Sequence, residues 1–498
     1  MSLVIRNGQV LTGAPAVLER ADILIERDRI AAVGPGLAAP ADAPEIDAAG
    51  RIALPGLANA HTHAASHLVR GRAGSWTLED LLTHTAANYG FRTPEDEYLS
   101  AAIGAIEMLK TGCTAAYDLY MSVPAVTEDA LEAVVRAYRD VGVRVVLAPA
   151  MADIVFYETV PRLLEVLPAD LRGTVAAMQA APTKGLLELT DRAIRRWHGS
   201  ADGRIRFAVS PTIPNQVTDE FLDGCVRLSR EHGVGVHTHL AESKVQVIES
   251  QRRHGQSIVA RLAAHGVLSP AFVGAHGVWL TDEDLGRLAD AGAAIAHNPG
   301  SNLRLGCGIA PVREMLDRGV PVGLGTDGSV CADNQNLFEA LRIASIVSTI
   351  RFPHQTNRWL GASTAWDLAT SGSARVLGQA GDLGAIAPGR KADVVLLRAA
   401  SVFLRPLADP VTALVYSETG ASVDTVIANG RVVVEAGRVT TVDEERIYSQ
   451  AQAAADRQRA ASHAAWTAAE QLAPYVAAAC RAAVVTPLPI NRYAAPPA

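Results

Sequence analysis

The chain has 498 residues, of which 49% are hydrophobic and 19% charged. This composition is typical of a folded globular protein with large cores and excludes a disordered chain. The formal net charge of −7 provides no basic surface for nucleic acid, and no apolar run is long enough to span a membrane. We therefore expect a globular protein that binds neither nucleic acid nor membrane.

The cysteines indicate the compartment. There are five; they are scattered and include no C-x-x-C pair. This pattern argues against a disulfide framework and against a thiolate zinc site, and it fits a reducing environment. The N-terminal segment also turns polar too early for a signal peptide. We therefore expect a cytoplasmic protein.

Both ends of the chain have the pattern of short strands with turns. Near the N-terminus, Asn7-Gly8 is a dipeptide typical of hairpin turns, so a turn is expected there. A second Asn-Gly precedes a β-branched run at 431–435. The simplest interpretation is one small β-sandwich domain, built from residues 1–54 and 384–440.

Residues 55–383 show a different rhythm, in which short apolar strands alternate with helices. Eight strand candidates lie at 52–60, 113–118, 143–149, 205–211, 235–240, 272–276, 293–297 and 322–327. This alternation belongs to the α/β class and predicts a (β/α)8 TIM barrel. Polar residues repeatedly end these strands, which is where barrel enzymes place their catalytic groups.

The last segment, 441–498, is rich in alanine and is predicted to be a helical extension followed by a tail. We expect it to pack on the barrel or on a partner subunit.

The first barrel strand ends in two histidines, His61 and His63. Residues i and i+2 of a strand share a face, so both imidazoles can aim at one point beyond the strand end. Two converging imidazoles suit Zn, Fe, Ni or Cu. An H-x-H pair on a solvated loop is the alternative, so the interpretation depends on finding further ligands.

Later strands supply such residues. The matching segments are H-T-H at 61–63, H-T-H-L-A-E at 237–242, G-A-H at 274–276, H-N-P-G-S-N at 297–302 and G-T-D-G at 325–328. On these motifs the chain resembles the amidohydrolase superfamily, in the branch of chlorotriazine hydrolases and aromatic or nucleoside deaminases.

The resemblance implies one divalent metal ion, zinc first and iron as the alternative, held by His61, His63, His239 and Asp327. It also implies that Glu242 is an acid that protonates a ring nitrogen, and that Asp327 accepts a proton from water. His276 would orient that water or stabilise the developing tetrahedral centre.

Three further residues bear on the metal count and on reactivity. Binuclear relatives use a bridging lysine at the end of the fourth strand, and the segment 209–214 has no lysine, which favours a single metal. His237 is expected to pack against the ligands instead of joining them. Cys331 is expected to be a buried small residue and not a nucleophile.

Five residues are candidates for contact with substrate: Trp76, Tyr120, His297, Asn302 and Arg304. For His297 the alternative is a loop held by hydrogen bonds, and for Asn302 and Arg304 it is turn chemistry. For Asp118, contact with the substrate and a purely structural role are weighed equally. The segment 64–94 departs from familiar deaminases because Thr77 follows Trp76 and no Pro-x-Glu appears, so we expect that segment to decide the substrate.

The predicted function is that of a metal-dependent hydrolase, foremost a hydrolytic deaminase of a purine, pterin, pyrimidine or triazine-like N-heterocycle. The alternatives are cleavage of an amide, urea or carbamate C–N bond and dechlorination of a triazine. A non-catalytic assembly protein is the remote alternative. A small molecule and water are the expected partners, and the resemblance implies a homo-oligomer, a dimer or higher.

Overall fold

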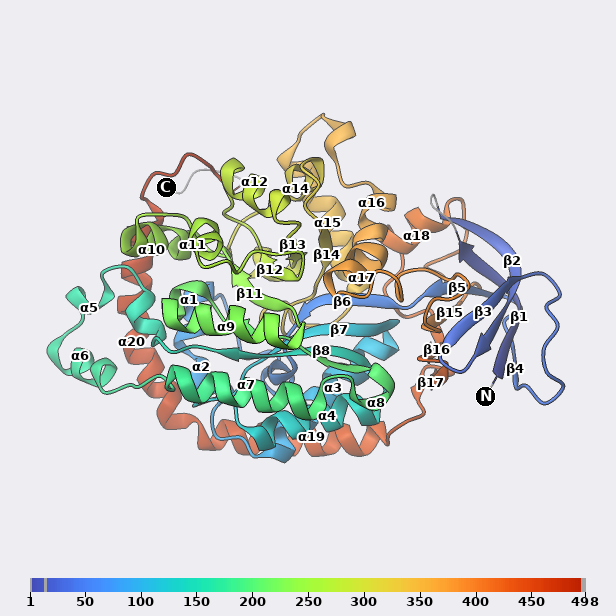
Figure 1. Cartoon of the computed structure of the whole chain (residues 1–498), viewed down its shortest axis with the longest axis horizontal. Helices are drawn as coiled ribbons and strands as arrows, with labels where there is room; N and C mark the ends of the chain where they lie inside the picture. Colours follow the sequence, from blue (N-terminus) through green and yellow to red (C-terminus); the bar gives the residue numbers. More distant parts are fainter. Residues whose placement is uncertain (1, 13–15, 494–498) are drawn as a thin grey trace.

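The computed structural model describes residues 2–12 and 16–493. A barrel of parallel strands forms the centre, and a sheet built from both chain ends lies at one side (Figure 1). The barrel strands are β6 (Leu57–Thr62), β7 (Cys113–Tyr120), β8 (Arg144–Met151), β9 (Ile205–Phe207), β10 (Ser210–Pro211), β11 (Val236–Leu240), β12 (Phe272–His276), β13 (Ala294–His297) and β14 (Val322–Leu324). The predicted TIM-barrel fold is confirmed.

Two backbone contacts between the two sets of strands close the barrel. One half runs β6-β7-β8-β10 with β9 beside β8, and the other runs β11 to β14 in order. A parallel bridge between Val209 and Val236 joins β10 to β11. On the opposite side, the amide of Asp327 donates to the carbonyl of His61 at 2.9 Å. This second contact brings the end of β14 against the first histidine.

Helices alternate with these strands and cover the barrel. They are α1 (Leu78–Thr83), α2 (Thr85–Tyr89), α3 (Pro94–Lys110), α4 (Glu128–Val141), α5 (Leu163–Val166), α6 (Ala169–Ala176), α7 (Thr183–Trp197), α8 (Ser200–Gly203), α9 (Asp219–His232), α10 (Lys244–His254), α11 (Ile258–Ala264), α12 (Asp282–Asp290), α13 (Pro299–Arg304), α14 (Val312–Asp317), α15 (Leu337–Arg351), α16 (Ala362–Asp367), α17 (Ser373–Val376) and α18 (Pro410–Tyr416). Their ends follow local chemistry: α3 begins with a Thr93–Asp96 capping box and Pro94 in its first turn.

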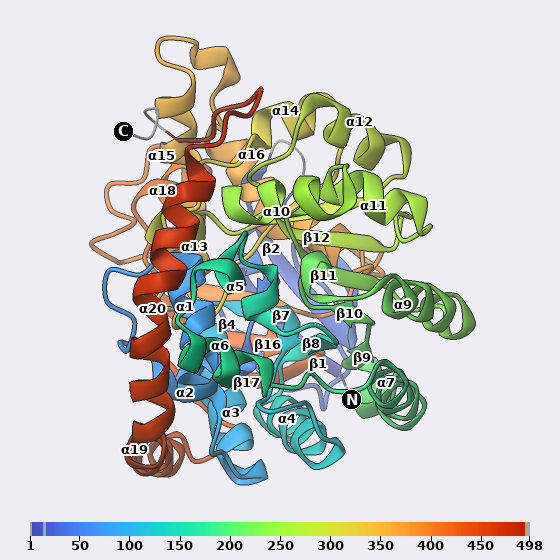
Figure 2. The same ribbon diagram turned by 90° about the vertical axis from the view of Figure 1, so that its left-hand side faces the viewer.

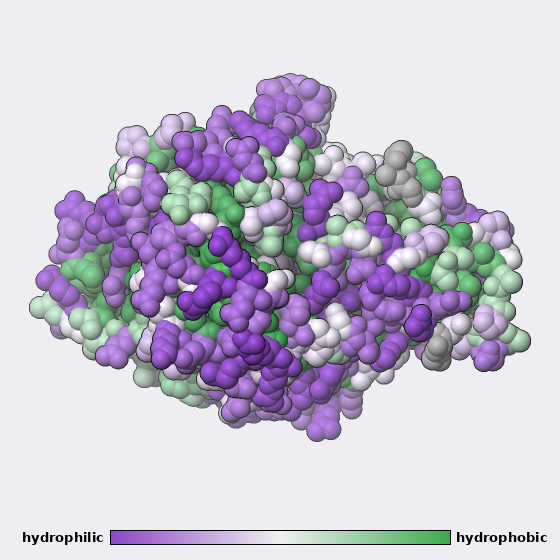
Figure 3. Space-filling view, viewed as in Figure 1, coloured by the Kyte–Doolittle hydropathy of each residue, from purple (hydrophilic) through white to green (hydrophobic). Residues whose placement is uncertain are grey.

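Within the described residues, nine strands form the sheet built from both chain ends, called here the end-built sheet. They are β1 (Ser2–Thr12), β2 (Val17–Glu26), β3 (Arg29–Gly34), β4 (Glu45–Asp47), β5 (Arg51–Pro55), β15 (Val394–Arg398), β16 (Val423–Ala428), β17 (Arg431–Glu435) and β18 (Arg438–Val439). Strand β5 pairs with β1 on one side and with β15 on the other, so it joins the two chain ends. In Figure 3, polar side chains cover most of the visible face over the helices, and apolar ones gather near this sheet.

The prediction of a turn at Asn7-Gly8 was wrong. Strand β1 continues through this dipeptide, with φ of 62° at Asn7 and a register shift between Ile5 and Gly8 that marks a bulge. The Asn7 amide donates to Asp22 at 3.0 Å, which stabilises the bulge. The same dipeptide at Asn429-Gly430 does form a two-residue turn, because Ala428 pairs with Arg431.

The C-terminal segment forms α19 (Glu444–Ala461) and α20 (His463–Val484). Figure 2 shows α20 running alongside α1, α2 and α5. Leu472 and Val476 of α20 belong to one apolar cluster with Tyr157 and Leu163, which lie between β8 and α7. The extension therefore packs on the barrel, at the end where the active-site loops lie. Of the residues that the structure describes, none lies in a helix that is long and apolar enough to cross a bilayer.

Candidate active site

Three imidazoles and one carboxylate converge at the C-terminal end of the barrel. His61 and His63 come from the end of β6, His239 from β11, and Asp327 from the turn after β14. Asp327 Oδ1 lies 3.5 Å from His61 Nε2 and 3.1 Å from His63 Nε2. The Nε2 atoms of His63 and His239 are 3.2 Å apart. All four residues are buried.

Backbone carbonyls fix the proton positions on two of these rings. His63 Nδ1 donates to Leu119 O and His239 Nδ1 donates to Thr212 O, each at 2.6 Å. Because a carbonyl oxygen can only accept, both Nδ1 atoms carry protons, and both Nε2 atoms are left to face the centre. This is the usual way in which a protein orients imidazole ligands toward a metal.

The protonation of these imidazole rings bears on whether they can hold a metal ion. Burial lowers the pKa of His61 to about 3, so this ring is neutral, and neither of its nitrogens has a hydrogen-bond partner among the described residues. Burial also opposes charging of His63, but the hydrogen bond and charge of Asp327 raise its pKa. Three imidazole nitrogens and a buried carboxylate are donors that divalent transition metals prefer. These residues therefore fit a divalent metal ion.

Glu242 and His276 lie beside this centre. His276 Nε2 is 3.6 Å from Glu242 Oε2 and 3.9 Å from Asp327 Oδ2. Burial, together with the charges of Asp327 and Glu79, raises the pKa of Glu242 well above its usual range, which favours the protonated form of this carboxyl. His276 Nδ1 is 2.9 Å from Asn302 Oδ1 and donates to it, which leaves Nε2 facing the centre.

The backbone is strained at this site. His276 and Asp327 have φ of 73° and 64°, in a region that side-chain-bearing residues rarely adopt. Such residues cost about 1–3 kcal/mol each and persist where their surroundings hold them. Gln335 provides one such restraint, because its Nε2 donates to the Asp327 carbonyl at 2.8 Å while its Oε1 accepts from Thr326 at 2.9 Å. No motif marked Gln335 in the sequence.

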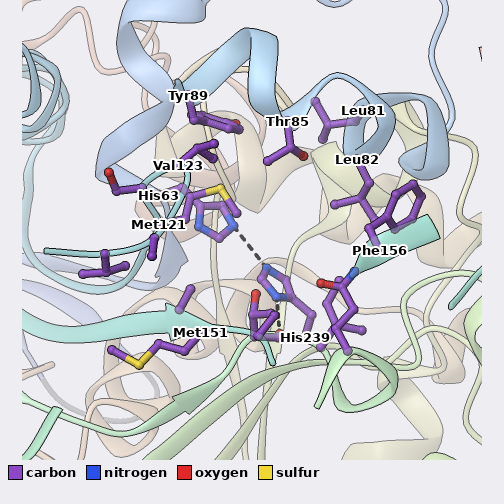
Figure 4. A pocket seen from close by; sticks show the side chains of 18 of the residues that line it. His63, Leu81, Leu82, Thr85, Tyr89, Met121, Val123, Met151, Phe156 and His239 are labelled. Carbon is purple, nitrogen blue, oxygen red and sulfur yellow. Dashed lines mark hydrogen bonds between the residues drawn. The ribbon is translucent and has the colours of Figure 1, made fainter. Parts of the chain in front are cut away.

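A cavity of about 200 Å³ opens from this centre (Figure 4). Its catalytic end is formed by His63, His239, Glu242, Asp327 and Cys331. Most of the remaining wall is apolar and comes from α1, α2 and the segments after β7 and β8. It includes Leu78, Leu81, Leu82, Tyr89, Met121, Val123, Met151, Phe156, Leu186 and Ile213. The segment 64–94 thus contributes one side of the cavity.

The five predicted substrate contacts have different positions. None of them is among the residues that line this cavity. Trp76 stacks on His84 at 4.5 Å between ring centroids, and Tyr120 is fully buried. His297 borders a separate small cavity. Asn302 contacts His276 as described, and Arg304 binds Asp333 at 3.0 Å.

Three other residues singled out in the sequence are also buried here. His237 packs edge-on against Tyr117, with ring centroids 4.1 Å apart. Asp118 accepts from the Ala64 amide and from the Tyr138 hydroxyl, each at 2.9 Å, so it holds the chain directly after the first histidine pair. Cys331 lines the cavity, and burial raises the pKa of its thiol well above its usual range.

The chain belongs to the amidohydrolase family, whose model matches residues 52–433. It is a hydrolase acting on carbon–nitrogen bonds other than peptide bonds. It is 34% identical to the 5'-deoxyadenosine deaminase of Methanothermobacter thermautotrophicus over 456 residues, which are 90% of this chain and 98% of that protein. It is also 36% identical to the 5-methylthioadenosine/S-adenosylhomocysteine deaminase of Desulforudis audaxviator over 461 residues, or 92% of this chain and 99% of that one.

Solved structures of similar proteins agree with this family assignment. The zinc complex of atrazine chlorohydrolase from Arthrobacter aurescens TC1 superposes with a TM-score of 0.82 at 30% identity, covering 91% of this chain and 100% of that chain. A zinc-bound adenosine deaminase from Xanthomonas campestris superposes with a TM-score of 0.81 at 24% identity, covering 92% of this chain and 98% of that one, and supports the fold alone.

Proposed function

We propose that this protein is a zinc-dependent hydrolytic deaminase that removes an exocyclic amino group from an N-heterocycle. The observation that carries the proposal is the position of Glu242. The buried Glu242 carboxyl lies 3.6 Å from His276 Nε2 and borders the same cavity as His63, His239 and Asp327. A buried acid beside a metal-binding centre is what protonation of a ring nitrogen requires.

His61, His63, His239 and Asp327 would hold the zinc ion. When bound there, zinc supplies a Lewis acid that makes water acidic enough to be deprotonated near neutral pH. Zinc-bound relatives of the same fold support the choice of zinc over iron.

The protein's own groups then divide the proton transfers. Glu242 donates a proton to the ring nitrogen next to the amino-bearing carbon, which makes that carbon more electrophilic. Asp327 accepts the proton of the attacking water through Oδ2, the oxygen that faces His276. His276 presents Nε2 to the same space and, held by Asn302, orients the water. Asp327 then passes the proton it took from water to the amino group, which leaves as ammonia as the C–N bond breaks. The new hydroxyl gives its proton to Glu242 as the ring carbonyl forms, so both carboxyl groups return to their starting states.

The substrate class follows from the relatives. Those named above are a 5'-deoxyadenosine deaminase and a 5-methylthioadenosine/S-adenosylhomocysteine deaminase, and they align with about nine-tenths of this chain. We therefore propose an aminopurine nucleoside or a ring of similar size. The likeness to atrazine chlorohydrolase keeps a second candidate, hydrolysis of a substituted triazine.

A substrate panel tests the proposal. Zinc-loaded protein would be incubated with 5'-deoxyadenosine, 5'-methylthioadenosine, adenosine, pterins, aminopyrimidines, chlorotriazines, ureas and carbamates. Release of ammonia, amine and chloride would be followed separately. Ammonia release from an aminoheterocycle, lost on chelation and restored by zinc, is the expected result. Amine release from ureas or carbamates without any heterocycle deamination would overturn it, and chloride release alone would favour the triazine candidate.

A further inference from the structure

The acidic side chains that line the cavity lie at its catalytic end. Of the described residues that line it, only Glu242 and Asp327 have ionisable carboxyl groups, and both lie at the catalytic end. None of the lining residues in the described part of the chain is a lysine or an arginine. Away from the catalytic end, the polar groups that line it are neutral, among them Thr85, Ser122 and Gln216. A ligand portion in this region therefore meets hydrogen-bonding groups but no cation.

The cations on neighbouring segments already have protein partners. Arg92 lies next to Tyr89 of the cavity wall, but its guanidinium donates to the Ala65 carbonyl at 2.5 Å and lies 3.5 Å from Glu97. Lys244 donates to the Val484 carbonyl at 2.6 Å. Arg304 donates to the Gly74 carbonyl at 2.7 Å, besides its ion pair with Asp333. None of these three cations is among the described residues that line the cavity.

Flexible and aromatic apolar side chains form much of the cavity wall beyond the catalytic residues. Leu82, Met121 and Phe156 are half-buried and Leu81 and Met151 are buried, and all five line the cavity in Figure 4. Methionine side chains adapt to irregular apolar groups, including thioethers and alkyl chains. A substituent that is uncharged and apolar gains free energy by leaving water here.

Resting on the proposed deamination, we infer that the enzyme selects amino-substituted heterocycles whose second substituent is uncharged and apolar, and that it discriminates against analogues with a carboxylate or phosphate in that place. An anion in this cavity would lose its hydration without gaining a lysine or arginine partner from the described residues that line it. The neutral donors of the wall tolerate hydroxyl or thioether groups.

Matched substrate pairs test this inference on the zinc-loaded full-length protein. The first pair is 5'-methylthioadenosine and S-adenosylhomocysteine, which share ring, ribose and thioether but differ in the charged amino-acid end. The second pair is N-ethylmelamine and N-carboxymethylmelamine. In whichever scaffold is deaminated, we expect kcat/KM for the uncharged member to be higher by at least about 100-fold. Equal values, or a preference for the charged member, would overturn the inference.

A variant adds the missing cation. Leu82→Arg places a guanidinium on the half-buried rim, where a long side chain can keep its head in water. This change should reduce the ratio between uncharged and carboxylated substrates by about 10-fold or more. The matched control is Leu164→Arg, because Leu164 is 38% exposed on α5 and does not line the cavity. A control that shifts the ratio equally would contradict the assignment of the effect to the cavity.

Failure of the two proposals can be told apart. If no heterocyclic amine releases ammonia, the proposed deamination fails. The selectivity is then decided by calorimetric titration of the zinc-loaded Glu242→Gln variant with the same pairs. Tighter binding of the uncharged member would uphold the selectivity, and equal or weaker binding would overturn it.

Discussion

His63 and His239 direct their Nε2 atoms at each other across 3.2 Å, while each ring donates its Nδ1 proton to a backbone carbonyl. Since these donors fix both rings with lone pairs facing inward, a bound cation should stabilise the fold as well as enable turnover. We expect chelation to abolish activity and to lower the free energy of unfolding by about 4 kcal/mol when the metal is normally present at 1,000 times its Kd.

The measurement is thermal unfolding and activity before and after dialysis against a chelator, with metal content by mass spectrometry. One zinc ion per chain should restore both properties, whereas Mg²⁺ should not, since imidazole-rich sites disfavour it. Full activity in protein shown to be metal-free would contradict the assignment.

Glu242→Gln should separate metal binding from proton transfer. The amide keeps the size of the side chain but cannot transfer a proton to the ring, so we expect kcat to fall by about 10²–10⁴-fold while metal content is unchanged. Glu283→Gln is the control, because the Glu283 side chain is 74% exposed on α12. Wild-type kcat in Glu242→Gln would exclude Glu242 as the acid.

Gln335→Leu should weaken the metal site without removing a ligand. The substitution deletes the donor to the Asp327 carbonyl, and the strained backbone at Asp327 then loses a restraint. We expect zinc affinity to fall by about 10–100-fold, as measured by competition with a chromogenic chelator. Restoration of kcat at high zinc concentration would identify positioning as the cause. Gln355→Leu, at an exposed glutamine, should leave the affinity unchanged.

Leu472→Ala on α20 should act on the substrate cavity from outside it. Leu472 is 2% exposed and packs in the cluster that contains Tyr157, the neighbour of Phe156. Removal of a buried leucine side chain costs about 2–5 kcal/mol. We expect a lower melting temperature and a higher KM with a smaller change in kcat, because the catalytic groups are not touched. Gln471→Ala, on the exposed side of α20, should change neither quantity.

Sequence patterns predicted the barrel well because its signals are local. Helix α3 has the predicted bounds, Pro94–Lys110, since proline at the start and Thr111-Gly112 at the end are strong local signals. Titratable residues at strand ends likewise predicted which side chains would meet, because parallel strands bring these ends together. His61, His63, His239, His276 and Asp327 do lie together in the structure.

Features that depend on tertiary contacts could not be predicted in this way. The Asn7-Gly8 dipeptide has the same local preference as Asn429-Gly430, but Asp22 from the neighbouring strand holds it in a bulge. Gln335 acquires its position only when the segment after β14 folds back on Asp327. The cavity wall combines segments that are distant in sequence. No sequence motif therefore indicated that Trp76 and Arg304 lie outside it.

The place of β5 in the end-built sheet has a consequence for synthesis on the ribosome. Residues 51–55 emerge early and can pair with β1 at once, but their other edge pairs with 394–398, which are made much later. Until then, an apolar strand edge is open to any other strand. The barrel residues are made while this edge of β5 is still unpaired. Truncated chains that end before β15 should therefore aggregate. Chaperones that cover strand edges should matter most during this interval.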